Sequence, residues 1–340
     1  MSRPLVVIDA DVLGRRRTGD ETYVQNLLRA LPAVAEDLRL AAVTRHPELV
    51  PAGVEPIELP ARSQELRMAL HLPRLLRRLR PRLAHFQYAL PPLLPCPAVV
   101  TIHDLSFEEG SSMMGRLDRL TFRTMVPRAA RRAASVLAVS ERTRRDLIER
   151  YGISPERIVV TPNGVDPAFV PGAGSPDGSS YVLFVGAVQR RKNPLAAAVA
   201  AAELGLPLVV AGPRKEPELA RELERRGARL LGYVEKPELA ELYRGAACLV
   251  LPSRFEGFGL PVLEAMASGT PVVAAPEPAL REVAGDAAVY AEPEGLADGI
   301  RRALCERERL VAAGLERAAE FSWERTARRT AEVYREVLGL

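Results

Sequence analysis

Short apolar runs alternate with longer segments of mixed polarity along the chain, and these runs have the length of buried strands. In the first half we expect strands at residues 5–8, 38–44, 82–86, 98–102, 135–139 and 157–160. In the second half we expect strands at residues 181–185, 208–211, 229–231, 248–251 and 271–275. Strands of this kind, separated by helical segments, predict α/β architecture with parallel sheets.

The intervening segments carry helix signals. Helices are expected at residues 21–31, 141–150, 239–243, 260–268 and 321–340. Ser140 is a typical N-cap, Pro261 suits a first helical turn, and Gly269 suits the residue after a helix.

The alternation of strands and helices occurs twice, which predicts two domains. Residues 167–180 are rich in Pro, Gly and Ser and are the best linker candidate. We therefore expect a first domain at residues 1–168 and a second at residues 180–320, and 340 residues suit two domains.

Composition narrows the class of protein. With 47% hydrophobic and 26% charged residues, the chain can form substantial cores without disulfides. Its three cysteines are far apart and lack metal-ligand spacing, as expected of reduced thiols in a cytoplasmic protein. No signal peptide and no run of 18 apolar residues is visible, so we expect a cytoplasmic chain without a membrane span.

The net charge of +4 hides two arginine-rich stretches, residues 67–82 and 116–132. A basic amphipathic stretch can dock peripherally on an anionic membrane surface, such as the inner membrane face, or it can be a solvated helix face over a leucine core. The chain has no zinc-finger or RNP-type motif, so we do not expect nucleic acid as a partner.

Residues 247–275 are the stretch around which the chain is organised, because they read as strand, glycine loop, helix and strand. Gly257 and Gly259 leave the backbone N–H groups accessible, and a helix N-terminus follows. Such a loop is a ready site for a phosphate or diphosphate.

Two acids, Glu256 and Glu264, accompany this loop. Carboxylates beside a diphosphate are useful when hydroxyl groups must also be held, because a carboxylate accepts two hydrogen bonds from a diol. Diphosphate and diols together indicate a nucleotide sugar. The alternative for an isolated pair is a surface loop with an ordinary helical Glu, but the flanking glycines, Pro261 and buried strands favour the site.

Further candidates lie at other strand ends. Gly186 ends one strand and is followed by the cations Arg190, Arg191 and Lys192, which suit a diphosphate. His103 ends the strand at residues 98–102, where ligands gather in doubly wound sheets. The Asp9-Ala-Asp11 sequence matches a metal-diphosphate motif of a different architecture, and we assign no metal there.

The sequence R-F-E-G-F-G-L-P-V-L-E-A-M-A-S-G-T-P-V-V, at residues 254–273, resembles the donor-site signature of family 4 retaining glycosyltransferases. The segments V-V-T-I-H-D-L and R-K-N resemble the same family. The resemblance implies the GT-B fold: two Rossmann-like domains facing a cleft, with the acceptor on the first, the nucleotide sugar on the second, and the final helix crossing back to the first.

The resemblance also implies roles for individual residues. The catalytic set is His103 near the reacting sugar, Glu256 facing the sugar hydroxyls, and Arg191 and Lys192 on the diphosphate. Glu264 holds the ribose and Tyr233 and Val234 lie by the base. The remaining donor-binding residues are Gly19, Gly186, Arg190, Gly257, Phe258, Gly259 and Leu260.

Two positions depart from the family. Where relatives commonly read T-G-I-G-R-Y, this chain reads Thr18-Gly19-Asp20-Glu21-Thr22-Tyr23, so a second glycine is missing. Some relatives place an Arg directly after the strand-end glycine, where this chain has Ala187.

The resemblance implies a retaining, metal-independent glycosyltransferase without a cofactor, which moves a hexose from a nucleotide diphosphate sugar to a saccharide or lipid-linked acceptor. GDP-mannose is the preferred donor, for an envelope or exopolysaccharide glycan. The alternatives are a glycogen-synthase-like glucosyltransferase, a sugar-nucleotide epimerase, and a non-catalytic nucleotide-sugar-binding subunit. A Rossmann dehydrogenase is excluded because no G-x-G-x-x-G follows the first strand.

Overall fold

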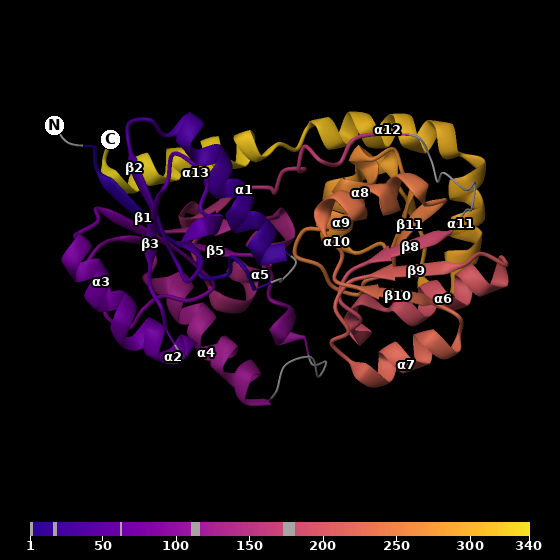
Figure 1. Cartoon of the computed structure of the whole chain (residues 1–340), viewed down its shortest axis with the longest axis horizontal. Coiled ribbons are helices and arrows are strands. Elements are labelled where there is room, and N and C mark those ends of the chain that lie inside the picture. Colours follow the sequence, from indigo (N-terminus) through magenta and orange to yellow (C-terminus); the bar gives the residue numbers. More distant parts are fainter. Residues whose placement is uncertain (1–2, 16–18, 62, 110–115, 173–180) are drawn as a thin grey trace. The chain divides into compact units, whose positions relative to one another are not determined.

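A computed structural model describes residues 3–15, 19–61, 63–109, 116–172 and 181–340, with the side chains of residues 116–118 left out. The chain forms two compact units (Figure 1). Unit 1 comprises the described parts of residues 1–108 and 114–164 together with Trp323–Leu340. Unit 2 comprises the described parts of residues 109–113 and 165–322. The expected linker at residues 167–180 therefore lies in unit 2, and its residues 173–180 lie outside the described residues.

Among the described residues, unit 1 contains one seven-stranded parallel sheet with the order β3-β2-β1-β4-β5-β6-β7. Its strands are β1 Leu5–Asp9, β2 Arg39–Thr44, β3 Glu55–Glu58, β4 Leu83–Gln87, β5 Ala98–Ile102, β6 Ser135–Ala138 and β7 Ile158–Val160. The order reverses between β1 and β4. In doubly wound sheets, ligands bind at the carboxyl ends of the strands at such a reversal.

Unit 2 has a second parallel sheet, of six strands among the described residues, with the order β10-β9-β8-β11-β12-β13. Its strands are β8 Val182–Val185, β9 Leu208–Ala211, β10 Arg229–Gly232, β11 Cys248–Leu251, β12 Val272–Ala274 and β13 Val289–Tyr290. Here the order reverses between β8 and β11. The expected α/β class with two Rossmann-like parallel sheets is confirmed.

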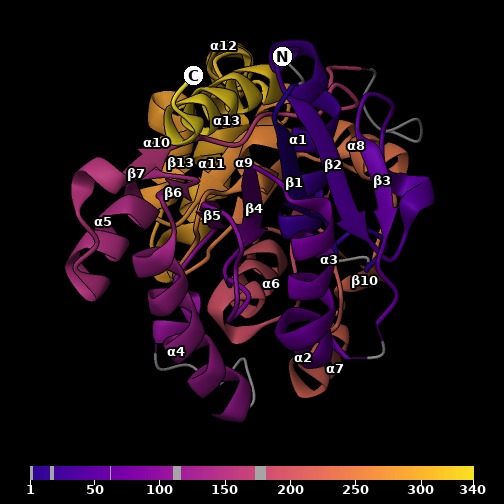
Figure 2. The ribbon, with the colours of Figure 1, turned by 90° about the vertical axis from the view of Figure 1, so that its left-hand side faces the viewer.

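Helices connect the strands of each sheet. Those of unit 1 are α1 Gly19–Val34, α2 Gln64–Leu66, α3 Leu72–Leu79, α4 Arg116–Arg132, α5 Glu141–Tyr151 and α13 Trp323–Leu338. Those of unit 2 are α6 Pro194–Glu203, α7 Pro217–Arg225, α8 Lys236–Gly245, α9 Leu260–Ala267, α10 Pro278–Ala284, α11 Leu296–Cys305 and α12 Arg307–Ala319. The final helix α13 packs beside α1 (Figure 2), so the end of the chain completes unit 1.

The predicted strands and helices agree with the structure to within a few residues, and three strands (residues 98–102, 208–211 and 248–251) agree at both ends. Strands β3 and β13 were not predicted. Strand β3 reads E-P-I-E and lies at the sheet edge, while β13 has only two residues. Neither presents the apolar run that identifies a buried strand.

The arginine-rich stretch at residues 67–82 has two different faces. Leu72, Leu75 and Leu76 of α3 are buried in the core of unit 1, while Arg74, Arg77 and Arg78 are exposed. The apolar face of α3 is therefore used within the fold, as in the alternative of a solvated helix over a leucine core. None of the described helices is both long and apolar enough to cross a membrane.

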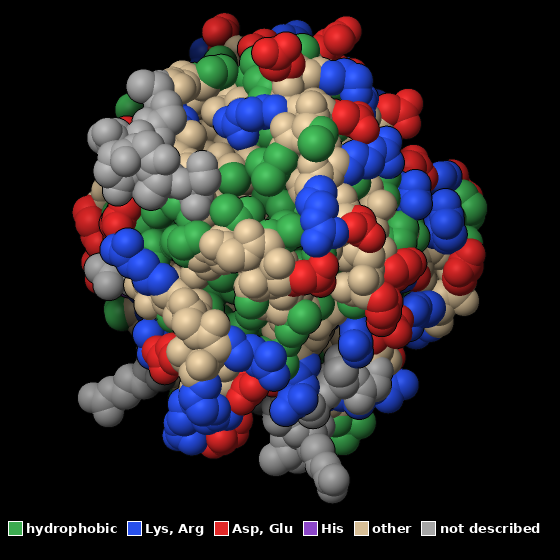
Figure 3. All heavy atoms as spheres, turned by 90° about the vertical axis from the view of Figure 1, so that its right-hand side faces the viewer, with side chains coloured by type: hydrophobic (Ala, Val, Ile, Leu, Met, Phe, Trp, Pro, Cys, Tyr) green, Lys and Arg blue, Asp and Glu red, His purple; other side chains and the backbone are tan. Residues whose placement is uncertain are grey.

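The surface of the chain mixes charges. On the face drawn in Figure 3, described side chains of Lys and Arg are interspersed with those of Asp and Glu around exposed hydrophobic residues. This face therefore carries no continuous patch of one sign among its described side chains. Several exposed arginines pair with acids three or four residues away, such as Arg225 with Glu222 and Arg302 with Glu306.

Candidate functional site

The candidate donor site lies in unit 2, where the strand order reverses. Strand β8 leads into a loop that begins with Gly186, and its neighbour β11 leads into the loop before α9. Both loops leave the carboxyl ends of adjacent parallel strands, so the topology brings them together. The loops carry Arg191 and Lys192 on one side and Glu256 on the other.

The loop after β8 is shaped by two glycines. Gly186 has φ +150°, and a Cβ atom there would lie 2.9 Å from Cδ of Lys192. Gly212, at the end of β9, has φ +149°, and a Cβ atom there would lie 2.1 Å from the carbonyl oxygen of Gly186. Only glycine permits both the positive φ and this close approach. Gly186 thus lets the Lys192 stem lie directly over the backbone, and Gly212 lets its own backbone approach that of Gly186.

Lys192 and Arg191 converge on one buried carboxylate. Lys192 Nζ donates to Glu256 Oε1 at 2.8 Å, and Arg191 Nη1 lies 3.7 Å from Glu256 Oε2. Arg191 Nη1 also donates to the carbonyl oxygen of Phe255. Both cations come from one turn, η5 (Arg190–Lys192), which Asn193 ends with φ +52°. Three site residues that were predicted in two separate segments of the sequence therefore form one cluster.

Glu256 is 7% exposed, and its environment favours the charged form. Burial by itself raises the pKa of Glu256, but the charges of Lys192 and Arg191 outweigh burial and hold its pKa below 4.5. The cluster is thus a carboxylate with two cations, enclosed in a site of low dielectric. A diphosphate would take the cations as partners and leave the carboxylate as a hydrogen-bond acceptor for hydroxyl groups.

The second loop ends at the N-terminus of α9. Gly259 has φ +108° at the N-cap, and a Cβ atom there would lie 2.7 Å from Leu280 Cδ2. Phe258 is 5% exposed, so the sequence-predicted residue at this position is a buried ring. The first N–H groups of a helix have no partner within the helix and attract anions. This loop therefore adds backbone donors beside Arg191 and Lys192.

Glu264 lies on the buried face of α9. Its Oε2 accepts a hydrogen bond of 2.8 Å from the Tyr243 hydroxyl of α8. Burial raises the pKa of Glu264 to about 7, although the Tyr243 hydrogen bond and the nearby Lys236 act in the opposite direction. Lys236 is itself paired with Asp166. Glu264 is therefore an acid whose charge changes near neutral pH, unlike Glu256.

His103 follows β5 in unit 1. Its Nε2 lies 2.8 Å from Gln87 Oε1, and its ring meets the edge of Tyr23 with the centroids 4.8 Å apart. The Thr143 hydroxyl donates to its backbone oxygen at 3.3 Å. Burial lowers the pKa of His103 below 6.5. The imidazole is thus held from several sides, with Nδ1 free of hydrogen bonds to the described residues.

Another histidine of unit 1, His85, lies in the middle of β4 and has a different environment. It is fully buried between Tyr334 and Thr101, and burial lowers its pKa to about 3. A neutral, enclosed imidazole of this kind cannot touch a substrate. The structure makes His85 an internal residue of unit 1.

The other predicted donor-binding residues lie around these groups. Arg190 is 68% exposed and pairs with Glu216 rather than Glu256. Tyr233 is exposed and Val234 half-buried in the turn after β10. Gly19 begins α1, but residues 16–18 of its loop lie outside the described residues. Ala187, which replaces the additional arginine of some relatives, is buried.

Asp9 and Asp11, which match a metal-binding motif of another architecture, are held by arginines. Arg67 Nη2 lies 2.5 Å from Asp9 Oδ1, and Arg45 Nε lies 2.8 Å from Asp11 Oδ1. Arg67 is itself 0% exposed, so it does not belong to the basic surface in which its neighbours lie. These carboxylates serve as anchors for guanidinium groups within unit 1. Among the described residues, no group of three or more His, Cys, Asp or Glu side chains has metal-site geometry.

Sequence reasoning missed the partners of the predicted residues. Tyr243, Gln87 and Gly212 belong to the candidate sites through contacts with Glu264, His103 and the Gly186 loop. Each partner is 16 or more residues distant along the chain. A strand-end position was the one signal available for Gln87 and Gly212, and Tyr243 had none.

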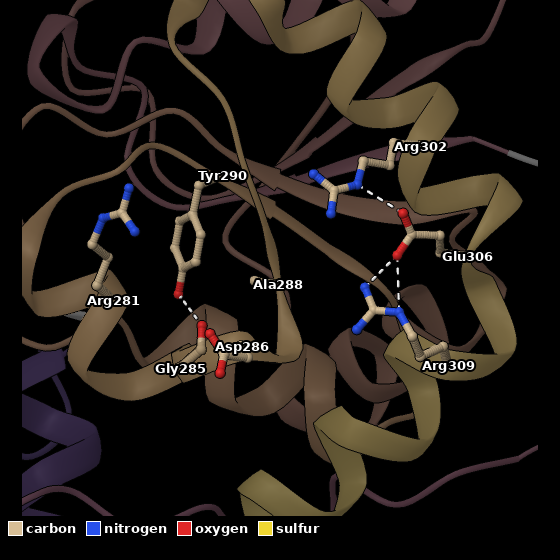
Figure 4. Close-up of a pocket in the computed structure, with 8 residues that line it drawn as sticks. All are labelled: Arg281, Gly285, Asp286, Ala288, Tyr290, Arg302, Glu306 and Arg309. Carbon is tan, nitrogen blue, oxygen red and sulfur yellow. Dashed lines mark hydrogen bonds and ion pairs between the residues drawn. The ribbon is translucent and has the colours of Figure 1, made fainter.

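A hollow in unit 2 lies apart from the cluster of Arg191, Lys192 and Glu256. Figure 4 shows Arg281 and Tyr290 on one side of it, and Arg302 and Arg309 flanking Glu306 on the other. Arg281 stacks over the Tyr290 ring at 4.4 Å. None of the predicted site residues is among the described residues that line it. Arg302 and Arg309 form ion pairs with Glu306, and Arg281 stacks on the Tyr290 ring.

Known proteins resemble both halves of the chain. Residues 17–169 match the family described as Glycosyltransferase Family 4, and residues 179–306 match Glycosyl transferases group 1. O-antigen chain mannosyltransferase B of Escherichia coli is 31% identical over 267 residues, which are 70% of each chain. D-inositol 3-phosphate glycosyltransferase of Geodermatophilus obscurus is 37% identical over 215 residues, 54% of this chain and 48% of that protein. The chain thus spans about half the length of the latter relative.

Solved structures share the fold. The crystal structure of Anabaena Alr3699/HepE in complex with UDP and glucose has a TM-score of 0.74 and 16% sequence identity, covering 98% of this chain and 100% of that chain. This likeness shows the GT-B architecture. Together with the two family matches and the Escherichia coli relative, it shows that the chain is a glycosyltransferase and belongs to glycosyltransferase family 4.

Proposed function

We propose that this glycosyltransferase is retaining and metal-independent, and that it transfers a hexose, with mannose from GDP-mannose preferred, to a saccharide or lipid-linked acceptor. The observation that carries the proposal is the cluster of Arg191, Lys192 and Glu256 beside the N-terminus of α9. It combines fixed cations and N–H donors for a diphosphate with a carboxylate for sugar hydroxyls. The mannosyltransferase relative supports the sugar.

In the proposed reaction, the bond between the anomeric carbon and the diphosphate oxygen breaks, and the sugar becomes oxocarbenium-like. Arg191, Lys192 and the first N–H groups of α9 stabilise the negative charge that develops on the leaving diphosphate. These groups take the part that a Mg²⁺ ion plays in metal-dependent transfer. The acceptor hydroxyl attacks the face from which the diphosphate leaves, and its proton passes to a diphosphate oxygen. This stereochemical course rests on the family.

The first test is thermal-shift binding to GDP, UDP, ADP and dTDP, each with and without Mg²⁺. A nucleotide at about 100 times its dissociation constant should stabilise the chain by about 2.7 kcal/mol. We expect GDP to raise the melting temperature equally with Mg²⁺ and with EDTA. A preference for UDP or ADP would favour the glucosyltransferase alternative, and no response to any nucleotide would contradict the donor site.

Lysine variants localise the response. Lys192→Met should abolish the nucleotide shift, while Lys215→Met should keep it, because Lys215 is an exposed lysine of the same unit without an ion pair to a described residue. For the nucleotide that binds, the matching sugar nucleotides are then tested for release of nucleoside diphosphate. Proton NMR of the product reports whether the anomeric configuration is retained.

The proposal includes peripheral contact with an anionic membrane, which suits a lipid-linked acceptor. Arg74, Arg77 and Arg78 are exposed along α3, and Leu66 and Leu70 just before it are 50% and 43% exposed. Because the leucines of α3 itself are buried, we expect an electrostatic contact. The chain should sediment with vesicles containing anionic lipid at low salt and be released by about 0.5 M salt. Equal binding to neutral vesicles would contradict this contact.

A further inference from the structure

The buried face of α13 carries three hydroxyl-bearing side chains at intervals of four residues. Thr326, Thr330 and Tyr334 are 2%, 0% and 0% exposed, and this spacing places them in one row on the helix. Burying polar groups in a core costs free energy unless each of them forms a hydrogen bond. The hydrogen-bond partners of these three side chains therefore indicate their role.

The row is joined to strands β4 and β5. The Tyr334 hydroxyl lies 2.6 Å from His85 Nδ1, and His85 Nε2 lies 2.7 Å from Thr101 Oγ1. His85 and Thr101 alternate with Phe86 and Val100, which belong to the core on the opposite face of the sheet. Their side chains thus leave the sheet toward the face that α1 and α13 cover (Figure 2).

The row continues to α1. Thr101 Oγ1 lies 3.0 Å from the Tyr23 hydroxyl, and the side chain of Thr330 is also hydrogen-bonded to Tyr23. The Thr330 hydroxyl in turn donates to the carbonyl oxygen of Thr326 at 2.8 Å. The hydrogen bonds therefore link Tyr334 of α13 to β4, β5 and α1 in turn, and Tyr23 of α1 is bonded to α13 again at Thr330.

One arrangement of protons satisfies every group. Because the Thr330 proton is directed at the Thr326 carbonyl, the Thr330 oxygen accepts from Tyr23. The Tyr23 oxygen then accepts from Thr101, and Thr101 accepts from Nε2–H of His85. Nδ1 of the neutral His85 is left to accept from Tyr334, consistent with a ring whose pKa burial lowers to about 3. Reversing the direction would leave Tyr334 without an acceptor among these groups.

Tyr23 connects this chain of hydrogen bonds to His103. Its ring meets the His103 ring edge-on, at an interplanar angle of 80°, and contacts Trp323 with the centroids 6.0 Å apart. Gln87 Oε1 holds the Nε2 side of His103 at 2.8 Å. The orientation of the imidazole therefore depends on Tyr23, whose hydroxyl is fixed by Thr101 and Thr330.

We propose that the hydrogen-bonded network Tyr334–His85–Thr101–Tyr23 positions His103 for transfer, so that helix α13 sets the geometry of the candidate catalytic histidine. This proposal rests on the proposed function and on the role near the reacting sugar that the family resemblance implies for His103. Its four members are positioning residues, because Tyr23 packs against the His103 ring and the other three act on His103 through Tyr23. Active-site groups must be held to within about 0.5 Å, which makes such support necessary.

The test compares two substitutions of Thr101, which lies in the middle of the hydrogen-bonded network. Thr101→Val keeps the shape of the side chain but removes the hydroxyl, so it breaks the network, whereas Thr101→Ser keeps the hydroxyl. We expect Thr101→Val to lower kcat at least 10-fold with the donor KM within twofold of the parent, and Thr101→Ser to restore most of kcat. Equal loss in both variants, or an unchanged kcat in Thr101→Val, would overturn the proposal.

A distant pair of variants controls for lost stability. Tyr334→Phe removes a buried hydroxyl at the end of the hydrogen-bonded network farthest from His103, and it should lower kcat as Thr101→Val does. Tyr181→Phe removes a hydroxyl that donates to the Leu242 carbonyl at 2.8 Å in unit 2, and it should leave kcat within twofold. A similar loss of kcat in both tyrosine variants would show a general effect of stability and contradict positioning.

A spectroscopic measurement keeps this test separate from the proposed function. The chain has only 4 histidines, so ¹⁵N-histidine spectra can be assigned by substitution. Thr101→Val and Tyr334→Phe should shift the His103 ring signals, and Tyr181→Phe should not. If the parent protein neither binds nucleotides nor transfers sugar, the proposed function fails. The shifts of the His103 signals still decide whether the hydrogen-bonded network positions the His103 ring. Unchanged His103 signals in both variants would refute it.

Discussion

Replacing Lys192 with methionine is expected to lower kcat/KM by roughly 10²- to 10³-fold, or about 3–4 kcal/mol, the scale of one lost oxyanion donor. The ammonium group is 2.8 Å from the Glu256 carboxylate and lies within a largely buried cluster. In the proposed reaction it stabilises charge that develops only as the diphosphate leaves, so kcat should fall together with kcat/KM. Steady-state kinetics with the donor identified by the nucleotide panel measure this loss.

The same substitution leaves Glu256 with one cation instead of two, so it should also destabilise unit 2. Removing one partner of a buried ion pair typically costs about 3–5 kcal/mol, because the remaining charge is uncompensated. The double variant Lys192→Met/Glu256→Gln removes that charge. It should regain most of the stability but none of the activity.

These variants separate catalysis from folding. Lys215→Met, an exposed lysine in unit 2, should retain activity and stability. If the double variant regained activity along with stability, Lys192 would be structural and the leaving-group assignment would be wrong.

The second large effect concerns the dependence of stability on pH at Glu264. The folded state raises the pKa of this buried acid from 4.5 to about 7. Below pH 4.5, both the folded and the unfolded chain hold the proton. Between these values the folded chain keeps a proton that the unfolded chain has lost, so the contribution of Glu264 to stability declines as pH rises through about 7. The total decline is on the order of 3 kcal/mol.

Glu264→Gln carries no charge at any of these pH values and should lack this decline. Relative to the parent, we expect the variant to gain stability as pH rises from 4.5 to 7, as measured by urea unfolding at intervals of half a pH unit. Glu294→Gln removes an exposed acid of the same unit and controls for the loss of one negative charge. A difference between Glu264→Gln and the parent that did not change with pH would contradict the shifted pKa.

Nucleotide binding gives Glu264 a second readout. If the ribose diol is held by the carboxylate form, the affinity for the nucleotide should rise by up to about tenfold per pH unit below the pKa and level off above it. Glu264→Gln should bind more weakly and without this pH dependence. Titration calorimetry between pH 5.5 and 8.5 distinguishes this binding role from an effect on folding alone.

The local sequence was enough to predict most of the strands, five of the helices and the outline of the site. Residues 98–102 and 248–251 are continuous apolar runs, and burial on both faces of a parallel sheet requires such runs. Ser140 caps α5 through the Thr143 N–H, and Pro261 lies in the first turn of α9, as their types predict. The glycine loop with Glu256 and Glu264 was visible because its residues lie close together along the chain.

The pairings between distant segments could not be read from the sequence. Arg67 belongs to an arginine-rich stretch, yet the fold buries it against Asp9, 58 residues away. Tyr334 meets His85 across 249 residues, and Tyr243 meets Glu264 across 21. The roles of the predicted site residues remain predictions, which the variants above test.

The chain by itself determined most of its strands, five of its helices, its family and the residues that carry the candidate chemistry, because hydrophobic periodicity, capping and glycine loops are local properties. Tertiary structure alone decided that Lys192 and Arg191 share Glu256, that Glu264 titrates near neutral pH, and that α13 reaches His103 through Tyr23. The physical reason is that strand order and helix packing, which no short stretch encodes, determine which side chains meet and how deeply they are buried.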